Sequence, residues 1–90
     1  MEGKPAAPEW IRRRWEKATR YYEVYLHPDL WGDWVLTRSW GRRGELLGRV
    51  VHTPCSSYQE GQQRLAAVQV RRQQRGYVRV PSPSGEESTL

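Results

Sequence analysis

The chain has 90 residues, which is enough for one hydrophobic core and therefore for one domain. Five Trp and five Tyr, without any Phe, concentrate the apolar surface in aromatic side chains, and such a composition excludes a disordered chain. A single cysteine excludes an internal disulfide, and the lack of an apolar run of about 18 residues or of a signal-peptide pattern predicts a cytoplasmic protein without a membrane segment.

The positive charge lies in the middle of the sequence. Residues 10–80 hold 14 Lys and Arg against 6 Asp and Glu, a net charge of +8, whereas the two ends are net negative. Nearly all of these cations are arginines, whose planar guanidinium suits bidentate phosphate contacts and stacking. Residues 1–9 and 81–90 have almost nothing to bury and predict two disordered tails, which leaves residues 10–80 as the folded domain.

Two strands are predicted in the first third of the folded part. Residues 11–17 alternate as in a strand, which we favour, although the same apolar residues would also line one side of a helix. Residues 21–26 alternate more clearly, with Tyr22, Val24 and Leu26 pointing one way. The Pro, Asp and Gly of residues 27–33 predict a loop, in which we expect Trp31 to cover the core as a lid.

A hairpin is predicted over residues 34–52. Trp34 to Trp40 forms its first strand, Gly41, Gly44 and Gly48 mark the turn region, and Leu47 to His52 returns.

The strongest helix signal covers residues 58–75. Ser57 followed three residues later by Glu60 is a capping box, and Gly76 is placed to end the helix. One face of this helix carries Tyr58, Gly61, Leu65, Val68 and Arg72. Residues 77–80 add a last short strand or pack beneath the sheet. The predicted fold class is therefore α+β, a small antiparallel sheet packed against one helix.

Catalytic and metal-binding motifs are missing. Cys55 precedes a helix N-terminus, where a thiolate is favoured, and His27, His52, Asp29 and Asp33 are the other candidate groups. They form no Cys-x-x-Cys, no His-Glu-x-x-His and no phosphate-binding loop between a strand and a helix. We therefore expect no catalytic residue, no metal and no cofactor.

The run from Arg38 to Gly44 is the strongest candidate for binding. It places the Trp40 indole, Gly41 and the guanidinium groups of Arg38, Arg42 and Arg43 around one turn, and Arg49 lies across that turn. Guanidinium groups bind phosphates, and an indole stacks on a sugar or base. The alternative is that Trp40 is a half-buried sheet residue and the arginines are solvated. Farther along, Arg71 and Arg75 either contact phosphate or complement the helix dipole.

These residues resemble the WGR domain family. The resemblance rests on Trp40-Gly41-Arg42, with Gly44 and Gly48 behind it, Tyr22 and residues 29–32 upstream, and Arg75-Gly76-Tyr77 after the helix. It implies a compact antiparallel sheet with one helix, as found in DNA-dependent poly(ADP-ribose) polymerases and in small bacterial proteins.

The resemblance also implies roles for the three motif residues. In the polymerases the motif Trp packs against the terminal nucleotide of a DNA break, and the motif Arg serves contacts that pass on the break signal. By position these roles fall on Trp40 and Arg42, and Gly41 lets a backbone come close. The chain departs from the family pattern at Arg43, where a branched aliphatic is usual, at Gly61, where Ala is common, and at Arg72, where Lys is usual.

Two functions follow from these features. The first is a non-catalytic nucleic-acid-binding module that grips DNA ends or strands through Trp40, Gly41, Arg42, Arg43, Arg38 and Arg49. The second is a protein–protein interaction module, in which exposed aromatics and arginines bind an acidic partner protein. The resemblance favours nucleic acid, with DNA as the expected partner.

Overall fold

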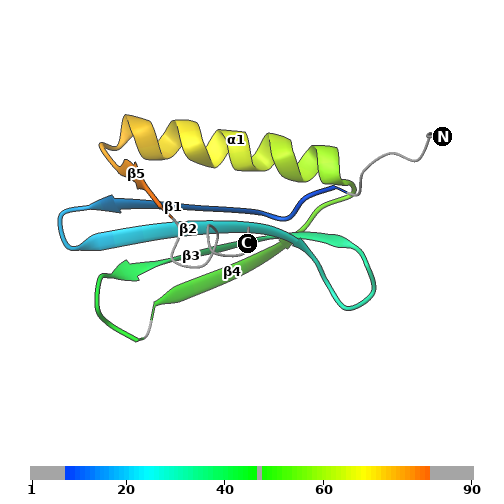
Figure 1. Ribbon diagram of the computed structural model, residues 1–90, viewed down its shortest axis with the longest axis horizontal. Coiled ribbons are helices and arrows are strands. Elements are labelled where there is room, and N and C mark those ends of the chain that lie inside the picture. Colours follow the sequence, from blue (N-terminus) through cyan, green and yellow to red (C-terminus); the bar gives the residue numbers. More distant parts are fainter. Residues whose placement is uncertain (1–7, 47, 82–90) are drawn as a thin grey trace.

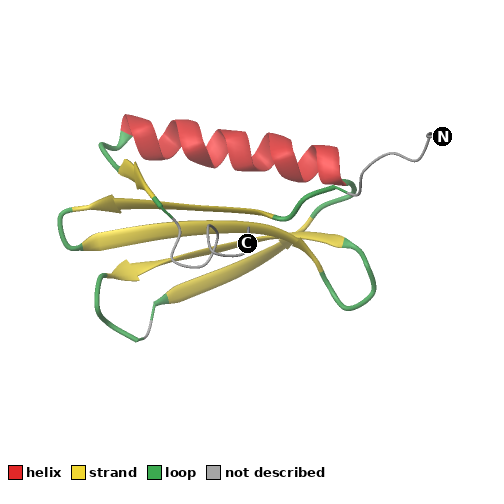
Figure 2. Ribbon diagram, in the orientation of Figure 1, coloured by secondary structure: helices red, strands yellow, loops and turns green. Residues whose placement is uncertain are grey.

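The computed structural model describes residues 8–46 and 48–81, and Figure 1 shows their arrangement. In chain order the elements are β1 (Ile11–Lys17), β2 (Arg20–Pro28), β3 (Trp34–Arg42), β4 (Arg49–Pro54), α1 (Tyr58–Gln74) and β5 (Val78–Val80). The five strands form one antiparallel sheet in the order β4-β3-β2-β1-β5. Helix α1 lies along one face of this sheet, and none of the described elements covers the other face, which we call the open face (Figure 2). The predicted α+β fold is confirmed.

The core lies between the sheet and α1. Strand alternation directs Trp15, Tyr22, Val24, Leu26 and Leu36 to the helix side, where all five are buried. The register supports this layer, because Trp15 pairs with Tyr22 and Leu26 pairs with Leu36. Residues 11–17 therefore form the predicted strand.

Helix α1 begins and ends close to the predicted residues. The Glu60 backbone N–H donates to the Ser57 hydroxyl at 3.0 Å, as the capping box requires. The Glu60 carboxylate, however, accepts from Ser56 instead of from the Ser57 backbone. The helix ends at Gln74, Arg75 forms the C-cap, and Gly76 follows with a φ of 84°, a left-handed conformation that glycine adopts without strain. The predicted end at Arg75 is thus one residue late.

The loop between β2 and β3 is shorter than predicted, and the prediction of a lid was wrong. Strand β2 continues through Pro28, so the connection is residues 29–33. The Asp29 carboxylate accepts from the backbone N–H groups of Trp31 and Asp33, both at 2.9 Å, which closes a tight turn. Trp31 is 81% exposed on this turn. The nearby end of the core is instead covered by Tyr58, whose ring packs on Trp34 at 4.7 Å.

Three further expectations concern the ends of elements. Strand β4 covers Arg49–Pro54, two residues later than predicted at each end, and Leu47 lies outside the described residues. Residues 78–80 form strand β5 beside β1, and Tyr77 packs against the core, so both predicted alternatives hold in part. Of the two predicted tails, residues 1–7 and 82–90 lie outside the described part of the chain.

Candidate functional site

Residues Trp40, Gly41 and Arg42 are the last three of β3. Strand alternation places Trp40 and Arg42 on the side that faces α1 and Gly41 on the open face. Trp40 pairs with Tyr22 of β2 on one side and with Arg49 of β4 on the other. The motif therefore lies where the sheet meets the turn between β3 and β4.

Trp40 is half-buried and takes part in an aromatic cluster. Its ring stacks on Tyr22 with centroids 5.6 Å apart and an interplanar angle of 9°. The Tyr22 ring meets Tyr77 edge-on at 6.5 Å and 75°. Because Tyr22 is buried against the core, it fixes the position of the more exposed indole.

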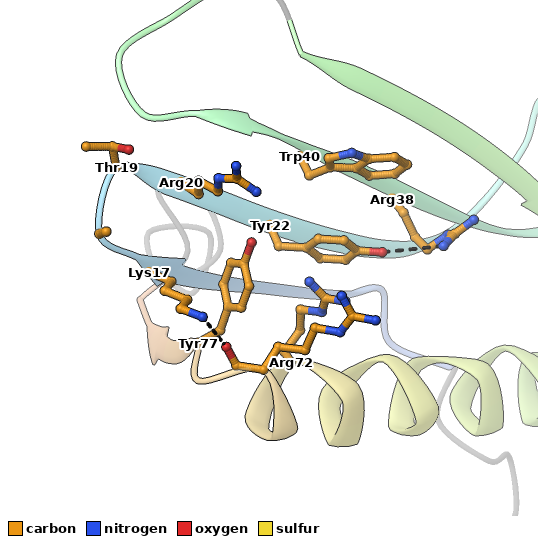
Figure 3. Close-up of a pocket in the computed structure, with 10 residues that line it drawn as sticks. Lys17, Thr19, Arg20, Tyr22, Arg38, Trp40, Arg72 and Tyr77 are labelled. Carbon is orange, nitrogen blue, oxygen red and sulfur yellow. Dashed lines mark hydrogen bonds between the residues drawn. The ribbon is translucent and has the colours of Figure 1, made fainter.

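A pocket of about 550 Å³ opens beside this cluster, as Figure 3 shows. It is bounded by the turn between β1 and β2, by β3 and by the C-terminal end of α1. Its lining residues are Lys17, Ala18, Thr19, Arg20, Tyr22, Arg38, Trp40, Arg72, Arg75 and Tyr77. Five of these side chains are cationic, three are aromatic, and none is a carboxylate. We call this space the aromatic pocket.

A second pocket of about 460 Å³ lies on the side of the motif turn. It shares Arg20, Trp40 and Tyr77 with the aromatic pocket. Its other lining residues are Tyr21, Gly41, Arg42, Glu45, Gly48 and Arg49. Trp40 therefore stands between two concave, mainly basic spaces, and each can hold an anion next to its indole.

Arg72 is the most unusual side chain of the site. Its guanidinium carbon lies 4.2 Å from the centroid of Tyr22 and 4.9 Å from that of Tyr77. Its Nε is buried and has no hydrogen-bond partner among the described residues. A buried donor without an acceptor costs about 1–3 kcal/mol, which cation–π contacts offset only in part. An incoming anion would supply the acceptor.

Arg38 reaches the same ring from β3. Its guanidinium donates to the Tyr22 hydroxyl at 3.4 Å, a long hydrogen bond, and lies 5.8 Å from the Trp40 centroid. Figure 3 shows Arg38 at the hydroxyl end of Tyr22, with Arg72 on the ring face away from Trp40. Two like charges thus lie against one tyrosine.

Two of the predicted binding residues, Gly41 and Arg43, have structural contacts of their own. The Arg43 guanidinium donates to the Ala18 carbonyl at 3.1 Å and lies 3.5 Å from Glu16, so it holds the turn between β1 and β2 and lines neither pocket. A Cβ on Gly41 would lie 3.2 Å from the Gly48 Cα and 3.3 Å from the Tyr21 ring. Glycine at this position therefore permits close packing within the protein itself.

Five of the six predicted binding residues line the two pockets, and Arg43 is the exception. Arg38 lines the aromatic pocket, Arg42, Arg49 and Gly41 line the second pocket, and Trp40 lines both. Arg75, for which phosphate contact and dipole complementation were the two alternatives, also lines the aromatic pocket. The residues that sequence reasoning did not assign to the site are Lys17, Arg20, Tyr22, Arg72 and Tyr77. One signal was available: Arg72 is a cation on the helix face that also carries Leu65 and Val68, where an apolar side chain is expected.

The candidate nucleophile and metal groups do not form a site. Cys55 is buried, and this burial, together with the nearby Glu60 carboxylate, raises the pKa of its thiol, which is the opposite of the effect that a position before a helix N-terminus favours. His27 and His52 both contact the Thr37 hydroxyl, each at 2.8 Å, on the open face. Within residues 8–46 and 48–81, no three His, Cys, Asp or Glu side chains are placed to hold a metal ion, and no helix could cross a membrane.

Comparison with known proteins supports one assignment. The family model of the WGR domain matches residues 10–84, most of the chain. No match was found among the curated proteins or the solved structures. The WGR domain is a module known from nucleic-acid-related proteins. The matched range covers the whole sheet, α1 and both pockets around Trp40, and the chain therefore belongs to the WGR domain family.

Proposed function

We propose that this chain is a non-catalytic module that binds nucleic acid, and that it holds the end of a DNA strand against Trp40. The observation that carries the proposal is the aromatic pocket, in which five cations and three aromatic rings meet without a carboxylate. A nucleotide presents the complementary features, an anionic phosphate beside a sugar and a flat base.

The geometry suggests how the ligand is divided among the side chains. Tyr22 occupies one face of the Trp40 indole, which leaves the other face for a sugar or base. Arg38 and Arg72 supply guanidinium forks on the α1 side, and Arg42 and Arg49 supply them on the side of the motif turn. Phosphates on either side of one stacked nucleotide would then each meet a pair of arginines.

The family role of Arg42 is compatible with this arrangement. Arg42 is exposed at the end of β3 and lines the second pocket. It can reach a phosphate and still face a neighbouring protein. The Arg43 guanidinium is already engaged with Ala18 and Glu16, so Arg43 contributes only its charge to the electrostatic potential of the site.

The test is a fluorescence-anisotropy titration of a blunt, 5′-phosphorylated DNA duplex against a closed dumbbell of the same sequence. We expect the open duplex to bind more tightly. Four neutralised phosphates predict a slope of about −3.6 in log K against log salt, on the order of a hundredfold loss from 50 to 200 mM. Binding that does not depend on salt, or that is equal and weak for both DNAs, would contradict the proposal and favour an acidic protein partner.

Two tryptophan variants separate the site from the rest of the surface. Trp40→Ala removes the stacking platform, and we expect a loss on the order of tenfold or more from a stacking contribution of about 1–3 kcal/mol. Trp31→Ala is the matched control, because Trp31 is 81% exposed on the β2–β3 turn and lines neither pocket. Thermal melting of both variants checks that they are folded. Equal binding by the two variants would reject Trp40 as the contact.

A further inference from the structure

Two smaller cavities continue the aromatic pocket along α1. The first, of about 300 Å³, shares Tyr22, Arg38 and Arg72 with the pocket and adds Ala67, Val68 and Arg71. The second, of about 240 Å³, shares Arg38, Ala67 and Val68 with the first and adds Leu36, Thr53 and Arg64. Because each cavity shares three residues with the one before it, the three spaces form one path. We call the part of this path formed by the two smaller cavities the helix–strand groove.

The groove exists because one helix is too narrow to cover a sheet of five strands. Helix α1 packs mainly on β2 and β3. The helix-facing side of β4, which carries Arg49, Val51 and Thr53, is left without a covering element among the described residues. The helix forms one wall of the groove, and β3 with β4 forms its floor.

The lining of the groove suits an extended polyanion. Its cations are Arg38, Arg64, Arg71 and Arg72, and no carboxylate lines either of the two smaller cavities. Arg64 is paired with Glu60 at 3.1 Å, but a solvent-exposed pair of this kind is weak, so Arg64 can turn to a phosphate. Leu36 on the floor, with Ala67 and Val68 on the helix wall, makes part of the lining apolar.

We propose that the helix–strand groove holds an unpaired nucleic-acid strand that leaves the aromatic pocket, so that the protein prefers a duplex end with a single-stranded overhang to a blunt one. This inference rests on the proposed function, since it extends the path of the same ligand. A strand fits better than an acidic peptide because the groove opens onto stacked aromatic rings, which suit the bases and sugars of a nucleic acid and have no counterpart in carboxylate side chains.

The length of the groove limits the overhang. Arg64, at the far end of the groove, and the C-cap residue Arg75, in the aromatic pocket, are eleven residues apart, which is about 16 Å along the helix axis. A stacked strand advances about 3.4 Å per nucleotide, so the pocket and the groove together accommodate up to about five nucleotides. Longer overhangs would extend beyond Arg64 and gain nothing further.

The experiment measures binding of one duplex with a blunt end or with overhangs of increasing length at either the 5′ or the 3′ strand. We expect one polarity to bind on the order of tenfold more tightly, with the gain complete by about five nucleotides. Two additional phosphate contacts should also steepen the salt slope by about 1.4. If a blunt duplex binds as well as every overhang, the proposed role of the groove is wrong, and the proposed function remains intact. No binding to any of the DNAs would overturn both.

A double variant tests the residues of the groove. Arg64→Gln with Arg71→Gln should remove the gain from the overhang and the added salt slope while blunt-duplex affinity is kept. Arg79→Gln is the matched control, since it removes an exposed arginine of β5 that lines none of the cavities. An overhang gain that survives in the double variant contradicts the proposal. So does a polyglutamate peptide that competes with the overhang as well as an oligonucleotide does.

Discussion

At the scale of single residues, the main feature of this molecule is a conflict between stability and binding at Arg72. Its guanidinium is packed between Tyr22 and Tyr77, with a buried Nε that lacks a partner within the described chain. A fold selected for stability alone would place an apolar side chain there, because Val68 and Leu65 occupy the same helix face. The proposed function accounts for this cation, because a phosphate would complete its hydrogen bonds.

The variant Arg72→Met tests this conflict. Methionine has a similar length and no polar hydrogen, so we expect the free energy of unfolding to stay within about 1 kcal/mol of the wild-type value or to exceed it. We expect DNA affinity to fall on the order of tenfold, since a guanidinium contact to a charged group contributes about 1.5–3 kcal/mol. Urea unfolding and anisotropy measure the two effects. A strongly destabilised variant would show that Arg72 serves the fold and not the ligand.

At the scale of elements, α1 is placed by two contacts, its capped first turn and its close approach to the sheet. The approach depends on Gly61, because a Cβ at this position would lie 2.4 Å from Cδ1 of the fully buried Leu26. The absence of a side chain lets the helix lie near β2, and this proximity brings Arg72 onto Tyr22. The side chain that fits at position 61, where the WGR family commonly has alanine, therefore depends in this protein on the size of Leu26.

The variant Gly61→Ala tests that coupling. Alanine adds about 1 kcal/mol of helix propensity, but overpacking against Leu26 costs about 1–3 kcal/mol, so we expect a net loss of about 1 kcal/mol in the free energy of unfolding. The double variant Gly61→Ala with Leu26→Val should recover most of the loss, because the shorter side chain makes room for the methyl group. Denaturant melts of the four proteins give the coupling energy, and purely additive effects would contradict the contact.

The first turn of α1 makes stability depend on pH. Hydrogen bonds from the Ser56 backbone N–H, the Ser56 hydroxyl and Arg64 hold the pKa of Glu60 below its ordinary value of 4.5. A depressed pKa in the folded state means that this carboxylate stabilises the fold above about pH 4.5 and loses its contribution as the pH falls through the folded pKa.

The variant Glu60→Gln is therefore expected to melt at a lower temperature than the wild type at pH 7. The difference should shrink progressively below pH 4.5, because the protonated carboxyl and the amide make similar contacts. Thermal melts across this range are the measurement. A difference that stays constant with pH would show that Glu60 acts through packing instead of charge.

Much of the element structure could be predicted from the sequence because local physical rules determine it. The capping signal at Ser57, the alternation from Tyr22 to Leu26 and the terminal Gly76 each act within a few residues. The predictions that failed or were incomplete depend on distant contacts. Trp31 was expected to cover the core, but Tyr58 from α1 occupies that end. Lys17 and Arg75 enter the site only because β1 lies beside the end of the helix, where the Lys17 ammonium donates to the Arg75 carbonyl.

At the scale of the whole molecule, the distribution of charge is uneven. Residues 10–80 carry a net charge of +8, yet Arg14 is paired with Glu16 and Glu23, at 3.0 and 2.7 Å. The carboxylates of the sheet therefore neutralise arginines of the open face, whereas the cations around the aromatic pocket repel one another. Such a concentration of one sign speeds association with polyanions and reduces the stability of the unliganded protein.

This imbalance predicts a specific response to anions. Inorganic pyrophosphate should raise the melting temperature more than sodium chloride at equal ionic strength, because it bridges pocket cations as well as screening them. A gain of 1 kcal/mol corresponds to about 4–8 °C for a domain of this size. Differential scanning calorimetry measures the shift. We expect Arg72→Met to respond equally to pyrophosphate and to sodium chloride, and Arg79→Gln to keep the larger response to pyrophosphate. Equal responses of the wild type to both salts would argue against an anion site.

The strand order has a consequence for the order of folding. Strands β1 to β4 are joined by short turns and can pair by local contacts, whereas β5 must find β1 across more than sixty residues, as the pairing of Arg14 with Val80 requires. Local pairings form with less loop entropy, so we expect the four-stranded meander to form first and α1 with β5 to dock last. Arg72, Arg75 and Tyr77 belong to the part that docks last. A nascent or locally opened chain would then have its four-stranded sheet but no aromatic pocket. Because a nucleotide binds only when the pocket is formed, a bound nucleotide should slow amide hydrogen exchange most in β5 and at the end of α1.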